Sequence, residues 1–143
     1  MPQSKKLSQC MINFLGSQGY SSSNLSNVAF HDGADGSLIA QAAFAHGNPA
    51  ITVGNNVYVA PGNWGRVSSP SGGATFFEET VHSIQWSSWG RVGFSAAYAV
   101  ASGMGYYNSG DAHNNPVENQ AIAMSNNLLR AYNSLPKNQK CSD

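Results

Sequence analysis

Two adjacent glutamates, Glu78 and Glu79, lie four and three residues before His82 in the stretch TFFEETVHSIQW. The chain has only three glutamates, so two of them are concentrated at one point. On a helix these three side chains would be neighbours, because residues three and four apart share one side. Adjacent carboxylates are costly to bury without a cation or hydrogen bonds. A metal ion would explain the pattern, with one glutamate and His82 as ligands and the other glutamate as a base. An exposed Glu–His pair without a metal is the alternative.

The third glutamate, Glu118, opens another candidate helix in NNPVENQAIAMSNNLLRAY. Asn115 as N-cap, Pro116 at the first helical position and Glu118 at the third form an almost complete capping box. That local role explains Glu118 without a metal. A carboxylate has two oxygens, however, so Glu118 could also be a ligand. Both interpretations stay open at this point.

Apolar spacing predicts the two helices that carry these glutamates, one over residues 74–88 and one from Pro116 to Tyr132. Their buried stripes consist of Phe77, Val81 and Ile84 in the first helix and Val117, Ala121, Met124 and Leu128 in the second. Glu78, His82 and Gln85 repeat the same spacing beside the first stripe. The first helix therefore presents a polar line next to an apolar one.

The remaining elements are short. We expect helices over residues 5–15, 35–47 and 91–103, with Asp35 or Ser37 as the cap of the second and Gly47 as its end. The β-branched runs on either side of Gly54-Asn55-Asn56 predict a β-hairpin. Polar or turn-rich connectors fill residues 16–27 and 63–73. The expected fold class is α+β, mainly helical, in a single domain of residues 1–143.

Composition excludes some function classes. The 143 residues include seven basic and seven acidic side chains, and charged residues make up only 10 %. This neutral balance argues against nucleic acid or an acidic lipid surface as a partner. No apolar run approaches the roughly 18 residues that span a bilayer, and the N-terminal residues lack the pattern of a signal peptide. We expect a secreted or translocated protein without a recognisable signal peptide, or a domain of a longer chain.

Cys10 and Cys141 are the two cysteines, one near each end of the chain. Chain termini often lie close together in compact domains. In an oxidising compartment a disulfide between them would close a loop of about 130 residues, worth up to roughly 4–5 kcal/mol. One buried and one exposed free thiol are the alternative.

The segments ITVGNNVYVAPGNW, ATFFEETVHSIQW and NPVENQA, in this order, resemble a bacterial family of short zincin-like metallopeptidase domains in contractile-injection and polymorphic-toxin proteins. The family pattern is a TVGNDVYFAPG-like hairpin, a helix with HExxHxxQ and a later helix that opens with NPxE or ExEA. The resemblance covers residues 28–128. It implies a zincin-like fold with a short hairpin before a central active-site helix and a third ligand on a later helix. It also implies Glu79 as the general base, His82 and Glu118 as metal ligands, and Gln85 as the family's glutamine.

The chain departs from the family at the first ligand, where Glu78 replaces a histidine. Zinc is the metal that the resemblance implies, but a Glu–His–Glu site is richer in oxygen and suits manganese or iron better. His113, five residues before Glu118, could replace the missing ligand. An unpaired loop histidine is the alternative for His113.

Two functions follow from these observations. The first is a metal-dependent peptidase domain of an exported bacterial effector or toxin, with a peptide or protein substrate and an inhibitory or carrier protein as a further partner. The second is a catalytically inactive zincin-like domain that serves as a binding or assembly module. For either function we expect Glu78, Glu79, His82 and Glu118 to converge in one partly buried cleft.

Overall fold

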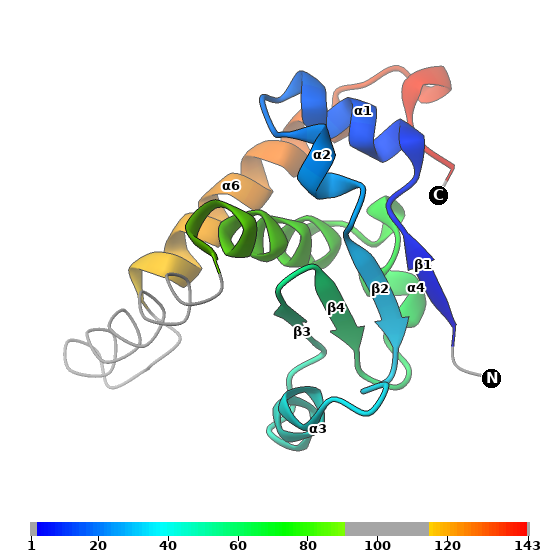
Figure 1. Cartoon of the computed structure of the whole chain (residues 1–143). Coiled ribbons are helices and arrows are strands. Elements are labelled where there is room, and N and C mark those ends of the chain that lie inside the picture. The colour runs from blue at the N-terminus through cyan, green and yellow to red at the C-terminus, as the bar shows by residue number, and fades with distance from the viewer. Residues whose placement is uncertain (1–2, 91–114, 143) are drawn as a thin grey trace.

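The computed structural model describes residues 3–90 and 115–142. These residues form an α+β fold in which helices gather above a small sheet and one further helix lies at the sheet's opposite end (Figure 1). This confirms the expected class. The helix predicted over residues 91–103 lies outside the described residues. No helix of the two described stretches combines the length and the apolar composition that crossing a membrane requires.

The sheet has four strands in the order β1-β2-β4-β3. The strands are β1 (Ser4–Lys6), β2 (Ala29–Asp32), β3 (Ala50–Val53) and β4 (Asn56–Val59). β2 and β4 are parallel, whereas β1–β2 and β3–β4 are antiparallel. The predicted hairpin is confirmed as β3–β4, and Gly54 in its turn has a φ of 64°, a conformation that glycine adopts without strain. The other two strands were not predicted, because three or four residues with little apolar alternation carry almost no local signal.

The helix predicted over residues 5–15 begins later than expected, at Gln9, as α1 (Gln9–Ser17). Ser8 has an extended backbone, and its hydroxyl accepts a hydrogen bond from the Met11 N–H at 3.1 Å. The cap therefore separates α1 from β1. The connector after α1, predicted as loop, contains the one-turn helix α2 (Ser22–Leu25).

The middle of the chain follows the prediction closely. α3 (Leu38–Ala45) is capped by Ser37, whose hydroxyl accepts from the Ala40 N–H, and Gly47 follows its end with a φ of 86°. Two short turns, α4 (Trp64–Val67) and η1 (Pro70–Gly72), occupy the turn-rich connector. After the undescribed stretch come α6 (Pro116–Asn133) and η2 (Lys137–Gln139).

A helix at residues 74–90, called the site helix below, lies at the centre of the core. Phe76 stacks on Phe30 of β2, with ring centroids 5.5 Å apart. Phe77 packs on the other side against Phe14 of α1 and Tyr132 of α6, at 6.3 and 5.6 Å. The site helix is therefore held between the sheet and two helices, which leaves it little freedom to rotate.

Cys10 of α1 and Cys141 form a disulfide with Cα atoms 5.7 Å apart. The segment after α6 returns to lie beside α1 (Figure 1). The Tyr132 hydroxyl also accepts a hydrogen bond from the Cys141 N–H at 2.8 Å. The disulfide and this hydrogen bond together tie the end of the chain to the core.

Replacing both cysteines with alanine is expected to lower the free energy of unfolding by up to roughly 4–5 kcal/mol. The disulfide closes a loop with a sequence separation of 131 residues, which restricts the unfolded chain. Urea denaturation of the oxidised protein and of the double variant measures the difference. Thiol titration of the denatured, unreduced protein should find close to no free thiols. Two reactive thiols per chain would contradict the disulfide.

Candidate metal centre

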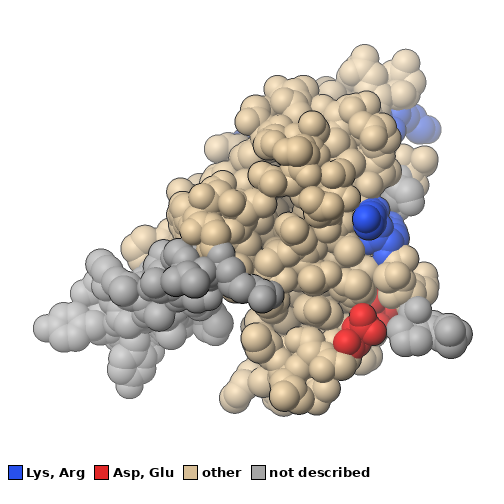
Figure 2. Space-filling view, viewed as in Figure 1, with Lys and Arg blue, Asp and Glu red and all other residues tan. Residues whose placement is uncertain are grey.

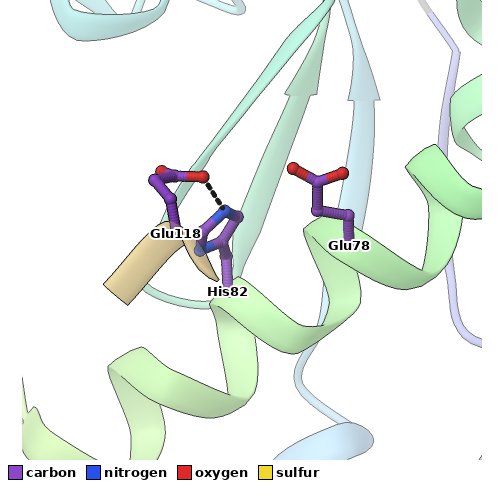
Figure 3. A group of neighbouring side chains, drawn as sticks. All are labelled: Glu78, His82 and Glu118. Atoms are coloured by element: carbon purple, nitrogen blue, oxygen red, sulfur yellow. Dashed lines mark ion pairs between the residues drawn. The ribbon is translucent and has the colours of Figure 1, made fainter. Parts of the chain in front are cut away.

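Side chains from two helices meet at one point. Glu78 and His82 extend from the site helix and Glu118 from the first turn of α6, all toward a common centre (Figure 3). One potential ligand atom from each residue lies within 4.8 Å of the other two. His82 Nε2 is 3.4 Å from Glu118 Oε2, and these two side chains are 11 % and 16 % exposed. We call these three residues the triad.

The first turn of α6 determines where Glu118 points. Asn115 has an extended backbone, and its side-chain oxygen accepts from the Glu118 N–H at 2.9 Å. Pro116 occupies the start of the helix, as predicted. Glu118 therefore lies in a capped first turn, and its carboxylate still reaches His82. Glu118 thus takes part in the capped first turn through its backbone N–H and contacts His82 through its carboxylate.

Glu79 lies beside the triad but points at the sheet. It is 8 % exposed, and its Oε2 accepts a hydrogen bond from the Thr52 hydroxyl at 2.6 Å. Thr52 belongs to β3, so the hairpin holds this carboxylate directly. Trp86 of the site helix donates from Nε1 to the Thr52 carbonyl at 3.2 Å. The sequence analysis did not identify Thr52. The one sign of it in the sequence is a hydroxyl side chain inside an otherwise apolar strand.

The electrostatics of the cluster favour a positive charge. Burial alone would lower the pKa of His82, but its hydrogen bond to Glu118, the charges of Glu79 and Glu118, and its contact with Gln85 together raise the pKa to about 9. At neutral pH a proton on His82 is therefore the cation that the carboxylates require. A divalent ion at the same place would take over that role.

Burial raises the pKa of both adjacent glutamates. Desolvation is the largest cause for Glu78 and for Glu79, and the charge of His82 opposes it in each case. The Thr52 hydrogen bond lowers the pKa of Glu79, and the nearby Glu118 raises the pKa of both. Both carboxyl groups thus bind a proton more readily than an exposed glutamate, which suits a group that must accept one.

The donor set fits a divalent metal ion. With ligand bonds of about 2 Å, two ligand atoms on one ion lie no more than about 4 Å apart. The His82–Glu118 contact is within this limit. A small rotation of the Glu78 side chain would bring its carboxylate within the same limit of both. One imidazole nitrogen and two carboxylate oxygens are ligands that zinc, manganese and iron all accept. The triad could therefore hold a metal ion.

Gln85, His31 and His46 lie in different surroundings. Gln85 accepts a hydrogen bond from His82 Nδ1 at 2.9 Å and so belongs to the cluster. His31 contacts Asn56 in the sheet, and His46 is the exposed C-cap of α3. His113 lies outside the described residues. Neither His31 nor His46 is a member of the triad.

Two hollows between the described residues lie away from the triad. One hollow is lined by residues of β1, α1 and η1, and another lies between the α1–α2 connection and the end of the site helix. Neither is lined by a member of the triad. Glu78, His82 and Glu118 gather in a partly buried cluster, and Glu79 lies buried beside them with its carboxylate on Thr52.

Comparison of the chain with protein-family profiles, with curated proteins and with solved structures found no match in any of the three.

Proposed function

We propose that this chain is a metal-dependent hydrolase, specifically a peptidase domain of an exported bacterial effector or toxin. The observation that carries the proposal is the convergence of Glu78, His82 and Glu118 from two separate helices, with Glu79 buried beside them. Three buried or half-buried carboxylates beside a histidine are costly in a purely structural role. A metal site gives each of these side chains a function.

The residues divide into ligands and a base. Glu78, His82 and Glu118 would hold the ion, which supplies Lewis acidity toward water and a substrate carbonyl. Glu79 would accept the proton of the attacking water, because burial raises its pKa and makes it a stronger base than an exposed glutamate. The Thr52 hydroxyl fixes one Glu79 oxygen at 2.6 Å and so holds the carboxylate in place.

Zinc is the metal of the zincin-like domains that the motifs resemble, and we propose zinc here. Manganese and iron are the alternatives, because Glu78 makes the donor set richer in oxygen than a His–His–Glu site. The proposed substrate is a peptide or protein. Uncharged side chains dominate the face shown in Figure 2, where Lys and Arg form only small patches. The neutral net charge likewise favours a peptide over a phosphate backbone.

The proposed location outside the producing cytosol rests on the disulfide between Cys10 and Cys141, since such bonds persist in oxidising compartments. An inhibitory or carrier protein in the producing cell is the partner that an exported toxin would require.

A catalytically inactive binding module is the second candidate. Glu78 favours it, because this residue stands where the zincin-like motif has its first histidine. The two candidates differ in turnover: the module would keep the fold, with or without metal, and would cleave nothing.

Elemental analysis of protein purified without chelator tests the proposal. About one zinc, manganese or iron ion per chain is expected, together with metal-dependent cleavage of an unstructured protein such as casein. Bound metal without cleavage under any of the three metals would favour the binding module. An empty protein that binds none of the three at micromolar concentration would contradict the metal site.

Metal affinity should rise with pH and level off above the pKa of His82. The ion and the proton compete for the ring, and the folded-state pKa of about 9 means that the proton is bound at neutral pH. Each pH unit below that value should weaken apparent affinity by about tenfold. Titrations of zinc into metal-free protein from about pH 6 upward measure the slope, and an affinity independent of pH would contradict His82 as a ligand.

A further inference from the structure

Gln85 links the two helices of the triad. It lies on the site helix three residues after His82, and the residue is 3 % exposed. Its Oε1 contacts His82 Nδ1 at 2.9 Å. Its Nε2 donates to two acceptors of α6, the Gln120 Oε1 at 2.9 Å and the Val117 carbonyl at 3.3 Å. One amide thus joins His82 to the helical turn that carries Glu118.

The acceptors on α6 decide which way the Gln85 amide faces. A backbone carbonyl can only accept, so the amide nitrogen must face Val117. Rotating the amide by half a turn would place its oxygen against that carbonyl and lose the hydrogen bond to Val117. The oxygen of Gln85 therefore faces His82.

This orientation in turn decides the state of the histidine ring. An amide oxygen can only accept, so His82 Nδ1 must carry a proton. The proton on Nε2, which faces the Glu118 carboxylate, is then the one that a metal ion would displace. Nε2 is also the atom that lies 3.4 Å from Glu118. The nitrogen available for a metal is the one that faces the other ligands.

We propose that Gln85 is a positioning residue that holds His82 in the Nδ1–H tautomer, with Nε2 directed into the triad, and that α6 sets this orientation through the Val117 carbonyl. The role in metal binding rests on the proposed function, whereas the tautomer does not. Metal-bound histidines generally donate their second ring N–H to a fixed acceptor, which sets both tautomer and orientation. In water a neutral histidine side chain prefers the proton on Nε2, so Gln85 works against an intrinsic preference.

Three variants separate the parts of this arrangement. Gln85→Met keeps the length of the side chain but removes both hydrogen-bonding ends, and it should weaken zinc binding by about 10–100-fold. Gln85→Glu keeps an acceptor for Nδ1–H and should stay closer to the wild-type affinity. Gln120→Ala leaves the Val117 carbonyl in place and serves as the matched control, with at most a few-fold change. Circular dichroism and thermal unfolding establish that each variant is folded.

The decisive readout is the tautomer of His82 in metal-free protein, taken from the ¹⁵N chemical shifts of the ring at a pH where the ring is neutral. It is measured in a Glu118→Ala background, so that the Glu118 carboxylate does not compete for a proton on Nε2. The proton should be on Nδ1 with Gln85 unchanged, in Gln120→Ala and in Gln85→Glu, and should move largely to Nε2 in Gln85→Met. An unchanged tautomer in folded Gln85→Met, or its loss in Gln85→Glu, would overturn the inference. If the wild type bound no metal and Gln85→Met still changed the tautomer, the proposed function would fail and the positioning role of Gln85 would stand.

Discussion

Replacing His82 with alanine is expected to leave the protein without bound metal. The substitution removes the one nitrogen ligand of the triad, whose Nε2 lies 3.4 Å from Glu118. Two carboxylates would then remain without a proton or ligand between them, and their repulsion would separate them. Elemental analysis should fall from about one ion per chain to background, and calorimetric titration with zinc should show no binding at micromolar concentration.

The same loss is expected for Glu118→Ala, and two controls isolate its cause. Asn115→Ala removes the N-cap that accepts from the Glu118 N–H, so it should cost about 1 kcal/mol of stability and keep the metal. His46→Ala removes an exposed histidine at the end of α3 and should change neither quantity. If Glu118→Ala lost only the stability of a cap and kept its metal, Glu118 would be a capping residue and not a ligand.

Replacing Glu79 with glutamine should separate metal binding from catalysis. The amide keeps the shape of the carboxylate and can still accept from the Thr52 hydroxyl, so the metal content should remain near that of the wild type. The amide cannot accept the proton of the attacking water. The rate of peptide cleavage should therefore fall by about 10²–10⁴-fold, the usual contribution of a general base.

Glu78→Gln is the matched comparison, because the two glutamates are adjacent and differ in role. It should weaken metal binding, since it removes the charge of a ligand, and any activity lost should return at higher metal concentration. Equal cleavage by Glu79→Gln and the wild type would exclude Glu79 as the base. Metal loss in Glu79→Gln, with Glu78→Gln unaffected, would reverse the two assignments.

The sequence by itself determined the elements that depend on neighbours in the chain. The spacing of Phe77, Val81 and Ile84 predicted the site helix and its polar side, because helical contacts join residues three and four apart. Asn115 and Pro116 predicted the start of α6 to the residue, since a cap satisfies backbone groups within one turn. The turn at Gly54 predicted the hairpin for the same kind of reason.

Tertiary structure alone decided the contacts between segments that are distant in the chain. β2 pairs in parallel with β4 although another helix and strand separate them, and nothing local in four residues specifies that pairing. The hydrogen bond from Thr52 to Glu79 and the amide bridge from Gln85 to α6 likewise depend on how three elements pack. Local residue types placed Glu118 in a first turn, but only the packing of α6 against the site helix brought its carboxylate to His82. The spacing of apolar residues specifies which side of a helix is buried. The segments that pack against that helix then decide which polar groups come into contact.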